Sequence, residues 1–306
     1  MKSLGEFIHG LDLKYGLYSS AGTKTCQGLP GGLDHEIIDA MDYASWEVDY
    51  LKYDNCFNQG RSSHERYTAM SDALLKSGRP IFYSVCNWGN EEIGSWGNTI
   101  ANSWRTTQDI EIYHTVHNQW QQIKSNFIQN QLSSKYASKG HWNDPDMLQI
   151  GNELLNLEEE QTHFALWAYA KAPLIIGCDL EKISDDSLAI LKNAELIAIN
   201  QDNLGYQAEC VVGCDFDQPT SVFKQTILTS ENVYIAVLVV NWDDENNQSY
   251  DLNLIDQKIA LTAGDNCSVT YSWTGETADV KGSAVISLTD IKPHGNQSLR
   301  IKCLPF

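Results

Sequence analysis

Apolar, strand-like runs alternate with segments of helical periodicity from residue 12 to about residue 200, and this alternation limits the fold more than any other feature. Because the strand-like runs are almost continuously apolar, they predict a parallel sheet covered by helices on both faces. We count six strand–helix units. The predicted strands lie at 13–22, 49–56, 80–88, 102–110, 141–148 and 172–179, and the predicted helices at 37–48, 63–77, 112–127, 157–171 and 184–199.

The predicted helices carry local signals of their own. Apolar residues at helical spacing predict a buried face on the first and third of them. Residues that favour helix ends also stand where we place the boundaries, with glutamates in the first turn of segment 157–171. The face residues are Ile37, Met41 and Ala44, then Ile112, Val116, Trp120, Ile123 and Phe127; the boundary residues are Ser63 as a cap, Gly78 as an end, and Ser184 as a cap.

Two architectures fit such a sheet. A closed (β/α)₈ barrel needs eight strand–helix units, and six are found. An open doubly wound sheet also fits six units, but no glycine-rich phosphate loop follows the first strand.

Beyond residue 205 the apolar residues no longer recur at helical spacing but at every second position, as they do in strands. The segments NVYIAVLVVNW (232–242), VTYSW (269–273) and LRIKC (299–303) alternate or run apolar, and polar turns such as DDENNQS separate them. This pattern predicts an antiparallel β-sandwich. We therefore predict a barrel-type domain over residues 1–204 and a β-sandwich domain over 205–306.

The composition of the chain limits the cellular compartment in which we expect the protein and the partners that we expect it to bind. The net charge of −19 repels nucleic acid phosphates and anionic lipids, so neither is an expected partner. No apolar run is long enough to cross a membrane, and the first residues do not form a signal peptide. Three sequons, at Asn247, Asn266 and Asn296, and eight cysteines favour a secreted glycoprotein whose natural N-terminus is absent here. Cys210 and Cys214 suggest a disulfide or two separate thiols rather than a metal site.

Polar side chains stand at the carboxyl end of every predicted strand, which is where parallel α/β folds bind their ligands. Carboxylates, amides and aromatic rings together suit a sugar, whose C–H face stacks on rings while its hydroxyls bind polar groups. The strand-end residues are Tyr18, Lys52, Asp54, Asn87, Trp88, Trp104, Arg105, Asp109, Trp142, Asn143, Asp144, Asp146, Cys178 and Asp179.

The stretch YLKYDNC (50–56) is the most telling of these strand ends, because it places Lys52 and Asp54 on the same side of a buried strand. Hydrolysis of a glycosidic bond needs two carboxyl groups, and a nearby cation keeps the nucleophilic one ionised. We therefore predict a sugar hydrolase.

Structural roles remain open for several of these residues. Arg105 can simply pair with Asp109. Asp144 and Asp146 flank a proline and can form a turn or bind a divalent cation. Cys86 can act as a nucleophile, although no histidine matches it, and a buried structural thiol is the plainer interpretation.

Six motifs in order resemble glycoside hydrolase family 27, the α-galactosidases, and the fungal members above all. They are LKYGLYSSAGTKTCQGLPGG, VDYLKYDNC, FYSVCNWG, SWRTTQDI, HWNDPDMLQIGN and LIAINQDNLG. The resemblance implies a (β/α)₈ barrel, a retaining mechanism with no metal or cofactor, and removal of terminal α-galactose. It implies Asp54 as nucleophile, Asp109 as acid/base and a Cys26–Cys56 disulfide. It also implies sugar contacts from Tyr18, Lys52, Arg105 and Asp146, and the loop after FYSVC adds Asn87 and Trp88 as candidate contacts.

The chain departs from the family pattern in two ways. Family members begin with two further βα units, whereas this chain starts just before the third strand, so activity of this chain alone is an open question. Ala101 stands where some relatives have a cysteine, which leaves Cys86 free. The family resemblance keeps α-N-acetylgalactosaminidase, β-L-arabinopyranosidase and a non-catalytic sugar-binding remnant open, and with them a homo-oligomer. The family resemblance also implies that the protein lies outside the cell or in the cell wall.

Overall fold

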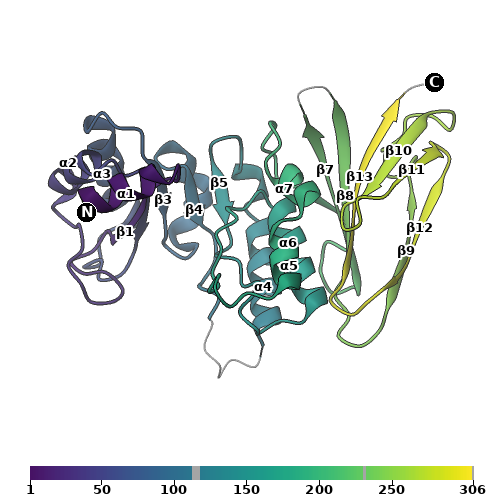
Figure 1. Ribbon diagram of the computed structural model, residues 1–306, viewed down its shortest axis with the longest axis horizontal. Coiled ribbons are helices and arrows are strands. Elements are labelled where there is room, and N and C mark those ends of the chain that lie inside the picture. Colours follow the sequence, from purple (N-terminus) through teal and green to yellow (C-terminus); the bar gives the residue numbers. More distant parts are fainter. Residues whose placement is uncertain (112–117, 230–231, 305–306) are drawn as a thin grey trace. The chain divides into compact units, whose positions relative to one another are not determined.

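Five parallel strands form the sheet of the N-terminal part of the computed structural model, which describes residues 1–111, 118–229 and 232–304. They pair in chain order and in parallel throughout, as predicted (Figure 1). The strands are β1 (Gly16–Ser20), β2 (Tyr50–Asp54), β3 (Phe82–Val85), β4 (Ser103–Arg105) and β5 (Trp142–Asp144).

The chain divides into two compact units, and this sheet belongs to the first. That unit comprises Met1–Asp109 and Gly140–Asp144, and the second comprises Ile110–Lys139 and Pro145–Phe306. The predicted domain boundary at residues 204 and 205 stays a prediction.

Helices α2 (Glu36–Ser45) and α3 (Ser63–Lys76) connect the first three strands and confirm two predicted helices. Helix α1 (Lys2–Gly10) was not predicted, and two short 3₁₀ helices, Asn90–Ser95 and Gly97–Thr99, precede β4. The predicted cap of α3 is wrong. Ser62 holds the N-cap position, and no serine side chain makes the capping bond. A distant glutamate supplies it instead, which no local pattern can reveal.

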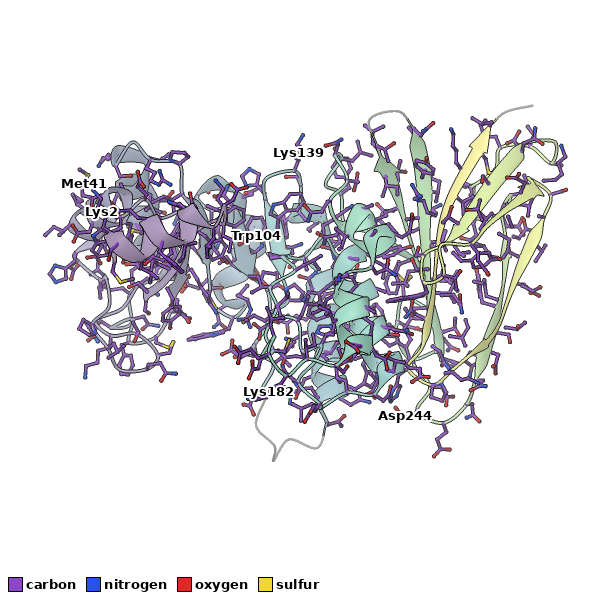
Figure 2. The ribbon with its side chains drawn as sticks, in the orientation of Figure 1. Lys2, Met41, Trp104, Lys139, Lys182 and Asp244 are labelled. Carbon is purple, nitrogen blue, oxygen red and sulfur yellow. A yellow bond between two sulfur atoms is a disulfide. The ribbon has the colours of Figure 1, made fainter. Side chains whose placement is uncertain are left out.

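The predicted buried face of α2 is also wrong for the described part of the chain. Ile37 is 65% exposed and Met41, which Figure 2 labels, is 54% exposed, whereas the helix buries Ala40 and Tyr43. On α1, Phe7 is 64% exposed. Among the described residues β1 pairs with β2 alone, which leaves its other edge open. The exposed side chains of Phe7, Ile37 and Met41 belong to the same unit as this open edge.

The described residues of the second unit form four α-helices, α4 (Gln119–Gln131), α5 (Leu157–Tyr169), α6 (Asp185–Leu191) and α7 (Ala194–Asn200), and a 3₁₀ helix at Ser134–Tyr136. On α4, the predicted face residues Trp120, Ile123 and Phe127 are buried. The first two residues of that predicted face, Ile112 and Val116, lie outside the described residues.

The last predicted helix, 184–199, is divided in the structure. Ser184 caps its first part, α6, as expected, by accepting a hydrogen bond from the Ser187 N–H. The helix then breaks at Asn193, whose side chain caps α7 by accepting from the Leu196 N–H. An asparagine that can bond to the backbone competes with helix continuation, which explains the break.

The predicted sixth strand, 172–179, is wrong. The segment makes a single parallel bridge, between Ile176 and Leu148, and one flanking bond from the Leu148 N–H to the Ile175 carbonyl. An apolar run becomes a strand only where a neighbour continues the hydrogen-bond ladder, and here the ladder stops after one step.

The C-terminal strands are antiparallel, as predicted. A six-stranded sheet has the order β11-β10-β13-β8-β7-β6, and a two-stranded sheet pairs β12 with β9. One apolar core lies between the two sheets and includes Val237, Leu299, Leu252 and Leu288. The strands are β6 (Glu209–Val212), β7 (Thr220–Leu228), β8 (Val233–Asn241), β9 (Gln248–Asn253), β10 (Asn266–Tyr271), β11 (Thr277–Lys281), β12 (Val285–Ile291) and β13 (Asn296–Leu304).

The antiparallel part of the chain, residues 209–304, is called the β-domain below, and it carries two disulfides, Cys210–Cys214 and Cys267–Cys303. Its sequons differ in access. Asn247 and Asn266 are exposed, whereas Asn296 is 8% exposed and its side chain bonds to Trp273 and Thr162. Folded protein therefore presents two of the three sequons for glycosylation. No helix in the described parts of the chain is long and apolar enough to span a membrane.

The contacts of one histidine in the second unit lead us to expect that the free energy of unfolding depends on pH. His294 lies 2.7 Å from a Glu159 carboxylate oxygen through Nδ1 and 2.8 Å from an Asp244 oxygen through Nε2. Both ring nitrogens must donate, which only the imidazolium can do. Partial burial opposes that charge, but the two carboxylates outweigh it and raise the pKa of His294.

A raised folded-state pKa stabilises the protein below the unfolded value, about 6.5, and this stabilisation is lost as pH rises through the folded value. We expect His294→Gln to lower the free energy of unfolding by about 1–2 kcal/mol near pH 5 and by little near pH 9. Urea unfolding at both pH values measures this. An equal loss at both would contradict the ionic role.

Candidate active site

The carboxylate of Asp54 ends β2 inside the first unit. The strand places Leu51 and Tyr53 in the core, and Asp54 is only 6% exposed. Two donors compensate for this burial: the Tyr18 hydroxyl donates to Oδ2 at 3.0 Å, and the Asn55 N–H donates to Oδ1 at 2.9 Å. A buried carboxylate held by two donors has a fixed orientation, as a nucleophile requires.

Tyr18 and Lys52 surround this carboxylate from paired positions on β1 and β2. Burial, and next the charge of Asp54, raise the pKa of Tyr18, so its hydroxyl stays a donor. Burial opposes the charge of Lys52, but neighbouring groups, Cys86 first and Asp54 among the others, raise its pKa. The Lys52 ammonium therefore stays protonated, 5.9 Å from the centre of the Tyr18 ring.

Arg105 and Asp109 form an ion pair at the end of β4. Arg105 is 1% exposed, and its Nη1 lies 2.9 Å from Asp109 Oδ1. Its Nη2 donates to the carbonyls of Thr107 and Gln108, at 3.1 and 2.9 Å. The side chain of Asp109 is 63% exposed, so the structure joins a buried cation to a carboxylate that solvent reaches. An accessible carboxyl group can exchange protons with a substrate and with water, as an acid/base must.

The end of β3 supplies Cys86, Asn87 and Trp88. Cys86 is free and 1% exposed, and burial raises the pKa of its thiol, so it is a poor nucleophile. The fully buried Asn87 donates to the Ser63 hydroxyl at 3.0 Å and to the Asn90 carbonyl at 2.6 Å. Its amide thus supports the loop, and its sugar contact stays a prediction. Trp88 is partly exposed, with a φ of 58°.

Asp146, a predicted sugar contact, belongs to the second unit. It is 7% exposed, and its Oδ2 accepts the Ile110 N–H at 2.7 Å. Its own carbonyl accepts the Trp167 indole N–H at 2.7 Å. These bonds fix the segment after β5, and the sugar contact of Asp146 stays a prediction.

The disulfide that the family resemblance implies is present. Cys26 and Cys56 are bonded, with 5.2 Å between their Cα atoms, and join the loops after β1 and β2. The Cys26 N–H donates to the Tyr18 hydroxyl at 3.4 Å. The two sulfurs and an Asp54 oxygen lie within 4.8 Å of one another, but sulfurs bonded to each other offer no thiolate to a metal ion.

The sequence analysis missed one buried cation that contacts the residue after Asp54. Arg66, on α3, is 1% exposed and donates to the Asn55 side chain and, at 2.6 Å, to the Ala21 carbonyl. It thus braces the residue that follows Asp54 and the end of β1. A charged residue beside Tyr67 and Met70, both fully buried, is the signal that could have found it.

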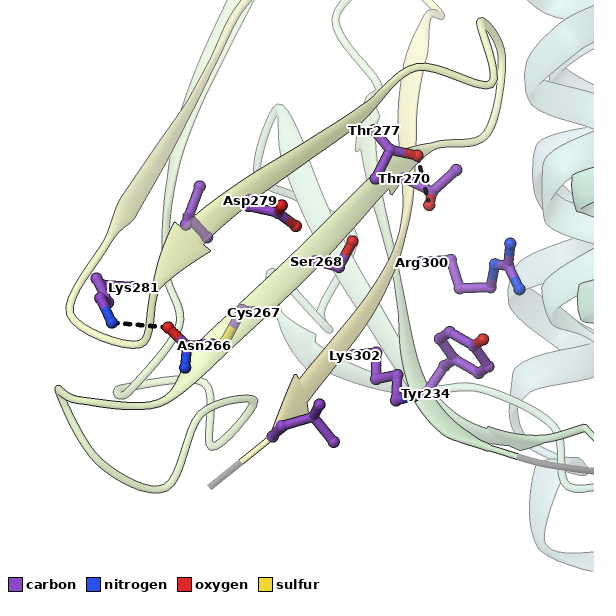
Figure 3. Close-up of a pocket in the computed structure, with 12 residues that line it drawn as sticks. Tyr234, Asn266, Cys267, Ser268, Thr270, Thr277, Asp279, Lys281, Arg300 and Lys302 are labelled. Carbon is purple, nitrogen blue, oxygen red and sulfur yellow. Dashed lines mark hydrogen bonds between the residues drawn. The ribbon is translucent and has the colours of Figure 1, made fainter. Parts of the chain in front are cut away.

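A cavity of about 720 Å³ lies elsewhere, lined mainly by residues of β10, β11 and β13 (Figure 3). None of the predicted site residues lines it. Among its lining residues Asp279 is the single carboxylate, whereas glycoside hydrolysis needs two. Two of its cations are already engaged, Arg300 with Glu195 and Lys302 with Asn232. This groove is therefore not the candidate active site. 

Comparisons with known proteins identify the family of the chain. The sequence model of the family described as alpha galactosidase A matches residues 1–202. Alpha-galactosidase 2 of Arabidopsis thaliana is 50% identical over 212 residues, which are 69% of this chain and 52% of that protein. The alpha-galactosidase of Cyamopsis tetragonoloba is 50% identical over 250 residues, 80% of this chain and 59% of that protein. The chain spans only about half to three-fifths of these relatives.

Solved structures show the same likeness over nearly the whole chain. Alpha-galactosidase I of Mortierella vinacea superposes with a TM-score of 0.84 at 32% identity, covering 98% of this chain and 79% of that one. The alpha-galactosidase of Saccharomyces cerevisiae gives 0.85 at 27% identity, covering 99% and 83%. From the matched sequence, the fold and the strand-end carboxylates together, this chain belongs to the α-galactosidase family, glycoside hydrolase family 27.

Proposed function

We propose that this protein is a retaining exo-glycosidase that removes terminal α-galactose from α-galactosides such as melibiose, raffinose-type oligosaccharides, galactomannan and glycolipids. The observation that carries the proposal is the buried Asp54 carboxylate, oriented by Tyr18 and Asn55 in the same unit as the Arg105–Asp109 pair. Asp54 attacks the anomeric carbon while Asp109 protonates the departing oxygen. Asp109 then takes a proton from the water that hydrolyses the galactosyl–Asp54 intermediate.

The other residues bind and orient the sugar in this proposal. Lys52 is a protonated donor for a hydroxyl and an electrostatic partner for Asp54. Trp88 offers a partly exposed aromatic side chain for stacking. Arg105, Tyr18, Asn87 and Asp146 complete the predicted sugar contacts.

The five parallel strands belong, in this proposal, to a closed (β/α)₈ barrel. The support is the open edge of β1 together with the exposed apolar side chains Phe7, Ile37 and Met41. A further βα unit paired with that edge would cover such side chains, because parallel strands are normally flanked by helices. Three disulfides also support an oxidising compartment, and hence secretion.

The test is hydrolysis of p-nitrophenyl α-galactoside by the full chain, followed by NMR of the first sugar released. We expect α-galactose as the first product, and faster reaction than with the α-N-acetylgalactosaminide or the β-L-arabinopyranoside. Release of the β-anomer first would exclude the retaining mechanism, which requires about 5–5.5 Å between the carboxyl groups. No hydrolysis by the folded chain, and none after further βα units are joined to the edge of β1, would leave a sugar-binding role in its place.

A further inference from the structure

The loop after β3 has an unusual backbone. Trp88, Gly89, Glu91 and Glu92 all have positive φ angles, of 58°, 80°, 54° and 50°. Only glycine adopts this conformation without crowding its own side chain. Three other residues adopt it within five positions, so surrounding contacts must hold the loop in place.

Glu91 provides such contacts by docking on the first turn of α3. Its Oε2 accepts from the Ser62 hydroxyl at 2.9 Å, and the Ser63 N–H donates to both carboxylate oxygens, at 3.0 and 3.1 Å. The Trp96 indole N–H donates to its carbonyl at 2.8 Å. Glu91 is exposed but its carboxylate loses some solvation, which opposes ionisation; the bonds from Ser63 and Ser62 outweigh this and lower the pKa of Glu91. The charge also suits the positive end of the helix dipole.

The same loop is tied to the segment that carries the ion pair of the candidate active site. The Gly89 N–H donates to the Arg105 carbonyl at 3.1 Å, and the Gln108 side chain donates to the Trp88 carbonyl at 3.4 Å. Gln108 directly precedes Asp109. A loop anchored on α3 at Glu91 therefore reaches the strand-end residues of both β3 and β4.

We propose that Glu91 is a positioning residue that, through its bonds to α3, holds the loop so that Trp88 is presented to the sugar. Only the sugar contact of Trp88 rests on the proposed function. Without the carboxylate anchor, Trp88 and its left-handed neighbours can relax to ordinary backbone conformations, and the aromatic side chain loses its fixed place.

The test compares Glu91→Ala and Glu91→Gln with Glu92→Ala. Glu92 is a matched control, because it is exposed and left-handed, and its carboxylate has no hydrogen-bond partner among the described residues. We expect Glu91→Ala to raise KM for the aryl galactoside about tenfold with a smaller change in kcat. Gln keeps an oxygen that can accept from the Ser63 N–H, so Glu91→Gln should fall between the native chain and Glu91→Ala. Glu92→Ala should resemble the native chain.

A second readout does not depend on activity. The indole N–H signal of Trp88, assigned by its loss in Trp88→Phe, is followed by NMR in each variant. We expect it to shift or broaden in Glu91→Ala and to stay in place in Glu92→Ala. Equal spectra in the two variants would overturn the positioning role. A shifted indole in a chain that hydrolyses no galactoside would keep the positioning role and count against the proposed function alone.

Discussion

Asp54→Asn is expected to lower kcat for p-nitrophenyl α-galactoside by about 10⁴-fold or more, the scale of losing a nucleophile. The amide is almost the same size as the carboxylate, and its oxygen can still accept the bond from Tyr18. The folded structure should therefore survive while the attacking atom is lost. Thermal unfolding of the variant, beside its kcat, measures both parts of this expectation.

The matched control is Asp279→Asn, which removes the single carboxylate of the groove on the β-domain. It should keep full activity, because that groove lacks a second carboxyl group. Activity within tenfold of the native chain in folded Asp54→Asn would remove Asp54 from the mechanism. Loss in Asp279→Asn instead would move the active site to the groove.

Asp109→Asn is expected to separate substrates by their leaving groups. An asparagine cannot protonate a poor leaving group, so hydrolysis of melibiose should fall by about 10³-fold, within the usual range for general acid catalysis. An activated aryl galactoside needs little protonation, so the step that forms its galactosyl intermediate should fall much less. The steady-state turnover of this aryl substrate should then be limited by the attack of water on the intermediate, because the Asp109 carboxylate that acts as its base is missing.

Azide distinguishes this mechanism from a general loss of structure. It attacks the intermediate without a base, so it should restore turnover of the aryl substrate by Asp109→Asn and yield galactosyl azide. The control is Asp34→Asn, since Asp34 is an exposed carboxylate that also pairs with an arginine, Arg61, at 2.7 Å. Equal losses with both substrates, with no effect of azide, would contradict the acid/base role of Asp109.

Much of the candidate site could be predicted from the sequence, because its residues stand at the ends of strands that the sequence shows as apolar runs. Tyr18, Lys52, Asp54 and Arg105 stand at the carboxyl ends of apolar runs, and the structure confirms those strands in parallel order. The Cys26–Cys56 disulfide followed from family resemblance and is also confirmed. The catalytic roles stay predictions that the variants above test.

Long-range contacts explain where the sequence failed. The cap of α3 comes from Glu91, 28 positions from Ser63 along the chain, so the local signal at Ser63 was misleading. The run at 172–179 has the composition of a strand but not a neighbour that continues the ladder. The break of the helix at 184–199 is local instead, because the Asn193 side chain caps α7 by accepting from the Leu196 N–H.

The amino-acid sequence alone specifies which segments are apolar, where they alternate with helices and which polar residues follow the strands, because these features depend on neighbours along the chain. The folded structure was needed to show that Tyr18 holds the Asp54 carboxylate and that Glu91 anchors the loop of Trp88. These are contacts between side chains and backbone groups from different elements. Their partners are chosen by packing and by the need to satisfy buried polar groups, and neither leaves a periodic signal in the sequence.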